Sequence, residues 1–399
     1  MIAMQQHGFR RNHSTESALL NFIKHFYETF NQKELGLAVF IDFSKAFDCL
    51  DHRILLSKME GLGIRGNALK LMKSYITNRK QYVFYNNEYS NPITPQYGTP
   101  QGSILGPLIF LIYVNDIVNA ARVLSLALYA DDVNGYKSNK CFRTLLNEIN
   151  NDLILINDWI LCNGLSINIL KICHMLINGE KINECYEIKI GNTVIPRVHD
   201  TKLLGLYVDE KLKWNVHIRY LTDKISKVCG VLYCIRKKLT AKAMRTIYLS
   251  LIYSHIIYCV PIWGNTWACH VRPVEIAQKR AIRTMNYMRR YDHTHEVFVT
   301  QKLLKFKYIY SYFSSLLIFK FLYSNYVPLV FSRANNPYGL RNSDNVSIPI
   351  SRTELYSKSV YFSAPSIWYN LPNHLKQMQN VNAFKSNAKA YLLTLQTHI

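Results

Sequence analysis

The sequence predicts an α+β fold in which helices cover one face of a mainly antiparallel sheet and a mainly helical region follows. Stretches with the apolar patterns of strands and of helices alternate up to about residue 212. The stretch 124–136, LSLALYADDVNGY, is typical of a strand, a tight turn and a second strand, and a hairpin pairs its strands antiparallel. Beyond residue 212 helical spacing dominates. Such an architecture leaves the uncovered face of the sheet open to a ligand.

The N-terminal part of the chain contains two strong element signals. Ser14-Thr15-Glu16-Ser17 precedes apolar residues at helical spacing, so we expect a capped amphipathic helix over 14–30. Residues 35–43, LGLAVFIDF, are apolar without a break up to Asp42, which predicts a strand buried on both faces. Further helices are expected over 44–60 and 67–78, and short strands over 81–85 and 93–97.

Residues 98–208 continue the alternation of predicted helices and strands. After Gly98 and Pro100, which indicate a turn, an apolar helical stretch extends to about Ala120. Residues 142–160 place apolar side chains at helical spacing, which predicts a helix with one buried face. Strands are expected over 172–178, 186–190 and 203–208, where they would complete the sheet.

Composition restricts the class of partner. The chain has 399 residues, enough for two or three domains, and 49% of them are hydrophobic, so a sizeable core is expected. Lys and Arg number 48 against 26 Asp and Glu, a formal net charge of +22. A soluble protein this basic usually binds a polyanion, because each cation placed on a phosphate releases a condensed counterion. Nucleic acid is the favoured partner, and an acidic membrane surface is the alternative.

Cysteine usage and apolar stretches indicate the compartment. The nine cysteines include no C-x-x-C pair, so no zinc finger is expected and free thiols in a reducing, intracellular compartment are the simplest interpretation. The N-terminus lacks the apolar stretch of a signal peptide. Residues 247–264 and 308–331 are apolar but interrupted by polar residues, so we expect buried helices and no membrane partner.

Three carboxylates lie at the ends of predicted apolar strands, where they are candidates for binding a metal ion. Asp42 ends an apolar strand, and Asp131 and Asp132 lie at the tip of an apolar hairpin. Burying charge beside such strands is costly unless a partner compensates for it. Mg²⁺ binds one or two carboxylates together with phosphate oxygens of a substrate. If the two strands are neighbours, Asp42 and Asp131 would share a pair of metal ions. The alternative is that Asp131-Asp132 is an ordinary turn pair.

Several sequence blocks together resemble one family. The blocks are GFRRNHSTESAL (8–19), FIDFSKAFDCLDH (40–52), GTPQGSILGPLIFLIYVNDI (98–117), YADDV (129–133), LSINILKICHMLI (165–177) and LLGLYVDEKLKW (203–214). Their order and their amino-acid sequences resemble those of the reverse transcriptases of non-LTR, LINE-type retrotransposons, in particular of jockey- and CR1-like elements. Residues 248–283 and 363–393 are also similar to later regions of these proteins. The resemblance therefore covers nearly the whole chain.

The resemblance implies a right-hand polymerase palm with partial fingers, followed by a helical thumb and a C-terminal region. The expected divisions are partial fingers over 1–34, a palm with the remaining finger elements over 35–212, a thumb over 213–300 and a helical C-terminal region over 301–399. The implied activity is RNA-directed DNA polymerisation. Its partners would be an RNA template, a DNA primer or target and a dNTP, and its cofactor two Mg²⁺ ions, with Mn²⁺ able to substitute. Protein partners are not indicated.

The resemblance assigns the catalytic residues one by one. Asp42 and Asp131 match the metal-binding aspartates, and Asp132 matches the catalytic carboxylate beside them. The backbone carbonyl of Phe43 is also expected to face a metal ion. Phe47 occupies the position of a steric gate, where an aromatic ring excludes the 2′-hydroxyl of an NTP. An ordinary core phenylalanine is the alternative for Phe47.

Nucleotide contacts are assigned in the same way. Ser44, Lys45 and Ala46 would begin a helix whose amides meet the triphosphate. Gln101 and Gly102 match a block that packs against nucleotide and template, although Gly102 also fits a simple turn.

Lys171 matches a lysine proposed to protonate the departing pyrophosphate, but Ile172 replaces the usual Thr or Ser and a solvated lysine is the alternative. Leu204 and Gly205 resemble a hairpin whose backbone contacts the primer. Tyr and Trp interleaved with Lys and Arg over 207–290 fit a thumb that binds an RNA–DNA hybrid.

Two other functions remain open. The chain begins after the finger segment that precedes the GFR block in LINE polyproteins, so we expect an N-terminally truncated copy. The first alternative is therefore a catalytically inactive, truncated nucleic-acid-binding protein derived from a reverse transcriptase. The second is an RNA-dependent RNA polymerase, which Phe47 disfavours. Location in the nucleus and in cytoplasmic ribonucleoprotein is inferred from the life cycle of such elements, because 236–238 is too short for an import signal.

Overall fold

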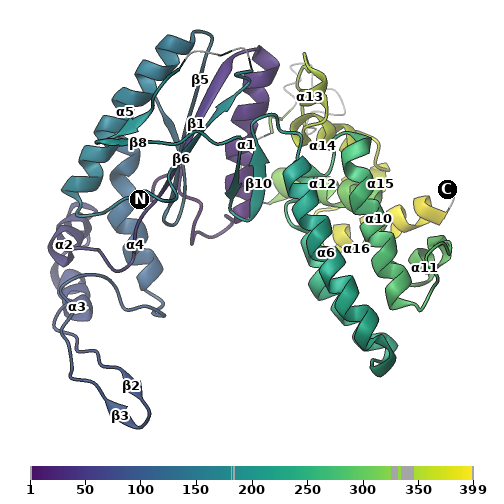
Figure 1. Cartoon of the computed structure of the whole chain (residues 1–399), viewed down its shortest axis with the longest axis horizontal. Coiled ribbons are helices and arrows are strands. Elements are labelled where there is room, and N and C mark those ends of the chain that lie inside the picture. Colours follow the sequence, from purple (N-terminus) through teal and green to yellow (C-terminus); the bar gives the residue numbers. More distant parts are fainter. Residues whose placement is uncertain (1, 181, 183–184, 325–330, 334–345, 398–399) are drawn as a thin grey trace. The chain divides into compact units, whose positions relative to one another are not determined.

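The protein is described by a computed structural model, which covers residues 2–180, 182, 185–324, 331–333 and 346–397. Contacts divide the chain into two compact units, each built from two stretches of sequence (Figure 1). Unit 1 comprises Met1–Ala18 and Glu34–Val198, and unit 2 comprises Leu19–Lys33 and His199–Ile399. The division into fingers, palm, thumb and C-terminal region stays a prediction.

Unit 1 is built around an antiparallel sheet in the order β4-β5-β1-β6 (Figure 1). Its strands are β1 (Leu35–Asp42), β4 (Ser125–Tyr129), β5 (Asp132–Asn139) and β6 (Cys173–Ile177). The register of β1 and β5 extends from Leu35 opposite Asn139 to Asp42 opposite Asp132. All residues of β1 except its two ends are buried, as the unbroken apolar run predicts. The α+β class with an antiparallel sheet is thus confirmed.

Three sequence expectations about strands were wrong in part. The stretches 186–190 and 203–208 do not join the sheet, because each folds back on its neighbour: β7 (Lys189–Ile190) pairs with β8 (Thr193–Val194), and β9 (Asp200–Leu203) pairs with β10 (Leu206–Asp209). The stretch 93–97 forms no strand but takes part in two isolated bridges, between Gln81 and Ile93 and between Asp51 and Tyr97. Instead, β2 (Phe84–Tyr85) and β3 (Glu88–Tyr89) form the hairpin. Asn86 and Asn87 have φ values of 49° and 63°, which permit a tight turn there.

The helices of unit 1 supply about half of its main hydrophobic cluster, and strands and loops supply the rest. They are α2 (His52–Gly61), α3 (Gly66–Ile76), α4 (Gly106–Val114), the short 3₁₀ helix η1 (Asn115–Asn119) and α5 (Phe142–Cys162). All residues of α4 except Pro107 and Leu108 are buried. The longer α5 buries a single stripe that includes Leu145, Ile149 and Ile156, as the helical spacing predicts. The helices over 67–78 and 142–160 are therefore confirmed.

The first helix, α1 (Thr15–Gln32), begins at the predicted cap. The backbone N–H of Ser17 donates to Ser14 Oγ at 3.2 Å, and the N–H of Ser14 donates to Ser17 Oγ at 2.9 Å. This reciprocal pair satisfies amides that the first turn of a helix leaves without partners. The helix continues from Ala18, the last residue of its segment in unit 1, into unit 2.

Unit 2 is mainly helical, as the sequence beyond residue 212 predicts. Its further helices are α6 (Asn215–Ile235), η2 (Arg236–Lys238), α7 (Ala241–Tyr248), η3 (Leu249–Tyr253), α8 (Ser254–Ile257), α9 (Val260–Trp263), α10 (Ala268–Met285), α11 (His295–Thr300), α12 (Phe306–Tyr323), α13 (Glu354–Ser357), α14 (Val360–Tyr369), α15 (Asn373–Lys376) and α16 (Val381–Thr397). Its core contains Trp214, Trp263 and Trp368, each almost fully buried. Large aromatic side chains thus contribute to its buried apolar surface alongside many aliphatic ones.

The two apolar stretches noted in the sequence lie in unit 2. Residues 247–264 are divided among α7, η3, α8 and α9, and 308–323 lie in α12. Residues 325–330 of the second stretch are outside the described residues. Among the helices that the structure describes, none combines the length and the hydropathy of a membrane span.

Candidate active site

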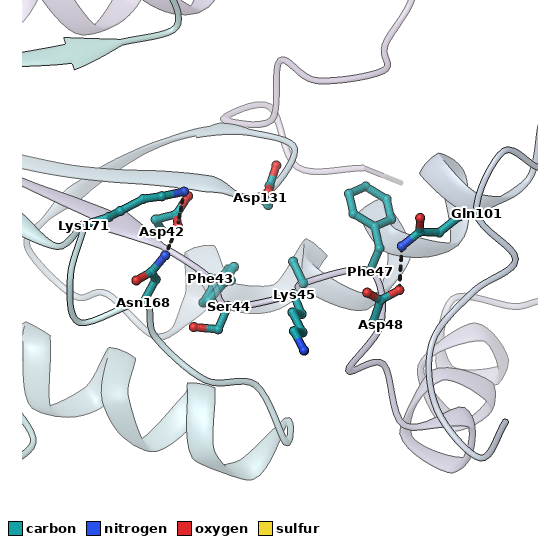
Figure 2. A pocket seen from close by; sticks show the side chains of 11 residues that line it. Asp42, Phe43, Ser44, Lys45, Phe47, Asp48, Gln101, Asp131, Asn168 and Lys171 are labelled. Carbon is teal, nitrogen blue, oxygen red and sulfur yellow. Dashed lines mark hydrogen bonds and ion pairs between the residues drawn. The ribbon is translucent and has the colours of Figure 1, made fainter.

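The three aspartates meet at one end of the sheet in unit 1. Asp42 and Asp132 are partners in the last pair of the β1–β5 register. Tyr129 pairs with Asp132, so Ala130 and Asp131 alone form the turn between β4 and β5. Asp42 and Asp131 line the same cavity, which has a volume of about 480 Å³ (Figure 2). The strand order β4-β5-β1 thus brings together the carboxylates that the sequence places far apart.

The charges at this end of the sheet interact. Burial, followed by the negative charges of Asp131 and Asp42, raises the pKa of Asp132 to about 6, and Lys171 opposes this shift. Neighbouring carboxylates raise one another's pKa because each disfavours the ionised form of the next. The site therefore holds an excess of negative charge that a cation would relieve.

Two side chains from the segment after α5 hold Asp42. Lys171 Nζ lies 3.0 Å from Asp42 Oδ2, and Asn168 Nδ2 donates to the same oxygen at 3.0 Å (Figure 2). The backbone N–H of Asn168 also donates to the carbonyl of Asp42 at 2.8 Å. The hydrogen bond and charge of Asp42 raise the pKa of Lys171. Lys171 is 65% exposed, so it pairs with the carboxylate and also contacts solvent.

Phe43 and Phe47 both line the cavity. Phe43 is buried in the core and bridges to Ile167. The ring of Phe47 stacks on Phe110 with ring centroids 4.4 Å apart, and Figure 2 shows this ring at the cavity. The sequence left a core role and a gate role open for Phe47. Its position accommodates both, because one side of the ring packs on the core while the residue reaches the cavity.

The helix expected to begin at Ser44 does not form, so this prediction was wrong. Residues 44–48 are turns, and Lys45 has a φ of 47°, which an α-helix cannot contain. The backbone N–H of Ser44 donates to the carbonyl of Ser166 at 2.8 Å. The helix α2 begins only at His52, where the side chain of Asp51 caps it. Ser44, Lys45 and Ala46 nevertheless line the cavity, without the helix N-terminus that the sequence suggested.

Gln101 lies in the cavity wall, and its Nε2 donates to Asp48 Oδ1 at 2.7 Å (Figure 2). Sequence reasoning did not place Asp48 in the site, yet it lines the cavity and holds Gln101 by this hydrogen bond. Asn168 was also missed, although it lies in the block that contains Lys171. Gly102 has a φ of 80°, and a Cβ added there would meet no atom within 4 Å, which fits the turn interpretation. Its contact with a nucleotide stays a prediction.

Leu204 and Gly205 lie in unit 2, at the turn between β9 and β10. Their φ values are 46° and 86°, and the hydroxyl of Tyr258 donates to the carbonyl of Leu204. Gly205 lines a second cavity, of about 260 Å³, together with Lys202, His217, Tyr220, Leu221, Lys224, His255 and Tyr258. The Nζ atoms of Lys202 and Lys224 lie 5.5 and 5.9 Å from the centre of the Tyr220 ring. This cavity is therefore basic and aromatic.

The donor atoms in the first cavity suit Mg²⁺. Among the described residues, no group of three or more His, Cys, Asp or Glu side chains is arranged to hold a metal by itself. Asp42 and Asp131 offer two carboxylates to one cavity, and Phe43 lies beside them. Mg²⁺ is usually bound by one or two carboxylates and completes its coordination with water and substrate phosphates. An incomplete oxygen set that faces a cavity fits such an ion.

Comparison with known proteins identifies the family. The family described as "Reverse transcriptase (RNA-dependent DNA polymerase)" matches residues 1–221. The chain belongs to the reverse transcriptase family. This membership agrees with the α+β palm that the sequence predicts, and the carboxylates at the β1 and β4–β5 ends lie within the matched region.

The relatives of this reverse transcriptase are proteins of non-LTR retrotransposons. It is 29% identical over 301 residues to a probable RNA-directed DNA polymerase from transposon BS of Drosophila melanogaster, covering 70% of this chain and 32% of that one. It is 27% identical over 302 residues to the RNA-directed DNA polymerase from mobile element jockey of Drosophila funebris, covering 72% and 33%. The resemblance to jockey-like elements is thus confirmed. The chain spans about a third of the length of these relatives.

Among solved structures, apo telomerase from Candida tropicalis is similar with a TM-score of 0.40 and 12% identity, covering 72% of this chain and 47% of that one. A Candida albicans telomerase in complex with a fragment of telomeric RNA has a TM-score of 0.37 and 12% identity, covering 71% and 52%.

Proposed function

We propose that this chain is the RNA-directed DNA polymerase core of a non-LTR retrotransposon. It would transfer a nucleotidyl group from a dNTP to the 3′-hydroxyl of a DNA primer that is paired with an RNA template. The observation that carries this proposal is the convergence of Asp42 and Asp131 on one cavity beside Asp132. Carboxylates contributed by two neighbouring strands supply the oxygen ligands that metal-assisted phosphoryl transfer requires.

Asp42, Asp131 and the carbonyl of Phe43 would hold two Mg²⁺ ions, or Mn²⁺ ions in their place. When bound, such ions lower the pKa of an attacking hydroxyl and neutralise charge on departing pyrophosphate. Asn168 and Lys171 orient the Asp42 carboxylate through their contacts at 3.0 Å. The ammonium group of Lys171 would also donate a proton to pyrophosphate, as the family resemblance implies.

The remaining wall of the cavity would select and position the nucleotide. Phe47 supplies an aromatic ring that is held in place by its stacking on Phe110. A ring fixed in this way would exclude a 2′-hydroxyl by contact, without a polar partner for that hydroxyl. Asp48 fixes the amide of Gln101 through a hydrogen bond of 2.7 Å, so Gln101 would present a defined surface to the nucleotide and template.

The second cavity would contribute to primer and hybrid binding. Lys202 and Lys224 line it and pack over the ring of Tyr220, which limits the movement of both side chains. Two lysines held beside one another suit a phosphate oxygen, because each supplies a charged N–H donor. This supports a role for the Leu204–Gly205 turn next to the backbone of a nucleic acid.

Primer extension tests the proposal. A labelled DNA primer on an RNA template is incubated with the chain, four dNTPs and Mg²⁺, Mn²⁺ or EDTA. We expect metal-dependent extension that falls by about 100- to 1,000-fold in Asp131→Asn, because this substitution removes a ligand charge and little volume. Asp158→Asn, on an exposed position of α5 outside the cavity, is the matched control and should retain activity.

The same assay separates the alternatives. Hybrid binding without extension in either metal would support the inactive nucleic-acid-binding protein and contradict the proposal. Equal extension with NTPs and an RNA primer would support an RNA-dependent RNA polymerase.

A further inference from the structure

The segment before α1 forms an additional edge on the sheet of unit 1. Gln6 bridges to Leu128 of β4 in a parallel arrangement. The N–H of His7 donates to the carbonyl of Leu128 at 2.8 Å, and the N–H of Leu128 donates to the carbonyl of Gln5 at 3.0 Å. The side chain of Asn115 accepts from the N–H of Ala3 at 2.7 Å. These bonds place the segment along the strand that leads into the turn at Ala130 and Asp131.

The side chain of Gln6 reaches the turn itself. It is only 2% exposed. Its Oε1 accepts from the N–H of Ala130 at 3.0 Å and from the N–H of Gly8 at 2.8 Å. Its Nε2 lies 3.5 Å from the carbonyl of Ala130. One buried amide therefore contacts both backbone polar groups of the residue that precedes Asp131, where water is excluded.

Ala130 needs such support because of its backbone conformation. Its φ is 54°, a left-handed value that a residue with a Cβ atom rarely adopts. Without a fixed partner, the turn would gain freedom to relax toward negative φ. That change would rotate the following peptide and redirect the carboxylate of Asp131. The hydrogen bonds of Gln6 oppose this relaxation.

Gly8 allows the close approach. A Cβ added at Gly8 would lie 2.4 Å from the backbone nitrogen of Ala130 and 3.1 Å from its Cα. Because the obstructing atoms belong to the backbone, no change of side-chain rotamer would relieve the clash. The contact between this segment and the turn thus has two requirements. Position 6 needs a side chain that forms hydrogen bonds, and position 8 needs a residue without a Cβ atom.

We propose that Gln6 is a positioning residue that fixes the β4–β5 turn so that Asp131 faces the cavity, and that Gly8 makes this contact possible. The inference rests on the proposed function, since it assigns Gln6 a role through Asp131. It gives the N-terminal segment a part in catalysis although none of the described residues before α1 lines the cavity.

The test uses three variants of the full chain. Gln6→Met keeps the length of the side chain and removes its hydrogen bonds. Gln6→Glu keeps an oxygen that can accept from the N–H groups of Ala130 and Gly8. Gly8→Ala disturbs the same contact without changing Gln6, because its Cβ would clash with the backbone of Ala130. Gly61→Ala is the matched control, because an added Cβ there meets nothing within 4 Å.

We expect kcat for primer extension to fall by about 30-fold in Gln6→Met and in Gly8→Ala, a loss typical of a displaced catalytic group. The Mg²⁺ concentration for half-maximal rate should rise, while KM for dNTP and Kd for the hybrid stay unchanged. Gln6→Glu keeps the acceptor but loses the donor to the Ala130 carbonyl, so its kcat should lie between those of Gln6→Met and the parent chain, and Gly61→Ala should match the parent chain. Equal losses in kcat and hybrid binding, or no loss in kcat, would contradict the proposal.

Hydrogen exchange separates failure of this inference from failure of the proposed function. The amide of Ala130 should lose protection in Gln6→Met, whether or not the parent chain extends a primer. If the parent chain is inactive, unchanged protection in this variant still overturns the inference.

Discussion

At the scale of single residues, the site depends on side chains that have two tasks. Phe47 packs on Phe110 and also lines the cavity. Asp48 closes the turn after Lys45, because its N–H donates to the carbonyl of Lys45, and its side chain also holds Gln101. Residues of this kind are difficult to assign from sequence, because either task alone explains the residue type. Substitutions that separate binding, catalysis and stability are therefore the informative ones.

Phe47 is the first such residue. We expect Phe47→Ala to lower the ratio of kcat/KM for dNTP to that for NTP by about 10- to 200-fold, the range for loss of one steric contact in a binding pocket. Single-nucleotide incorporation with matched dNTP and NTP measures this ratio. Phe84→Ala, at an exposed position in β2, is the control and should leave the ratio unchanged. An unaltered ratio in Phe47→Ala would assign the ring to the core alone.

Because of the buried His174 in β6, we expect the free energy of unfolding of the protein to depend on pH. Burial lowers its pKa to about 4, and its ring contacts the carbonyl of Ile195 at 3.0 Å. Because the folded pKa lies below the unfolded value of 6.5, the unfolded chain binds more protons and stability is lost as pH falls from about 6.5 toward 4. Between pH 7.5 and pH 5 this residue should account for a loss of about 2 kcal/mol.

Urea unfolding at both pH values measures the effect. His174→Asn cannot be protonated in this range, so its free energy of unfolding should fall less on acidification than that of the parent chain. His293→Asn, at an exposed position, should behave as the parent does. Equal pH dependence in His174→Asn and the parent would show that this imidazole does not resist protonation.

At the scale of elements, hydrogen bonds tie stretches that are distant in sequence into one unit. All of α1 from Leu19 onward belongs to unit 2, where Trp214 Nε1 donates to the hydroxyl of Tyr27 at 3.1 Å. The hydroxyl of Tyr361 in α14 donates to the carbonyl of Leu20 at 2.5 Å. These contacts connect the N-terminal helix to elements that follow β10 and to α14. The fold of unit 2 therefore requires residues from both ends of the chain.

Removal of the Tyr27 hydroxyl tests this connection. Tyr27→Phe leaves the buried N–H of Trp214 without its acceptor, so the free energy of unfolding should fall by about 1–3 kcal/mol. Urea unfolding followed by tryptophan fluorescence measures the change. Tyr291→Phe is the control, because Tyr291 is 82% exposed. A loss below the experimental error for Tyr27→Phe would mean that water replaces the hydroxyl.

At the scale of the whole molecule, charge determines the class of partner. The net charge of +22 favours a polyanion, and family membership makes nucleic acid the expected one. The second cavity, with Lys202 and Lys224, offers a defined place where part of this charge would act. Binding through phosphates should therefore depend steeply on salt.

Salt titration of hybrid binding measures the number of phosphate contacts. The logarithm of the affinity should fall linearly with the logarithm of the salt concentration. The double variant that carries Lys202→Gln and Lys224→Gln should reduce the magnitude of this slope by about 1.8, or about 0.9 for each lost phosphate contact. Lys389→Gln, an exposed lysine on α16, should leave the slope unchanged. A slope near zero for the parent chain would remove the argument for a basic binding surface.

The sequence was most informative where the signal is local. The capped helix at Ser14, the buried strand β1 and the hairpin at Asp131 were all predicted, because capping, unbroken apolarity and turn residues act over a few neighbours. The helix at Ser44 was wrong, since the left-handed Lys45 and the bond from Ser44 to Ser166 depend on a distant segment. Asn168 and Asp48 could not be recognised as members of the site for the same reason, because their contacts also depend on distant segments.

The sequence by itself therefore determined which carboxylates are available, the local elements that carry them and the excess of positive charge. Only the tertiary structure decided that Asp42 faces Asp132, that Asp48 holds Gln101 and that Gln6 supports the turn at Ala130. Strand register and contacts between remote segments follow from the packing of the complete core. A pattern of neighbouring residues does not contain that information.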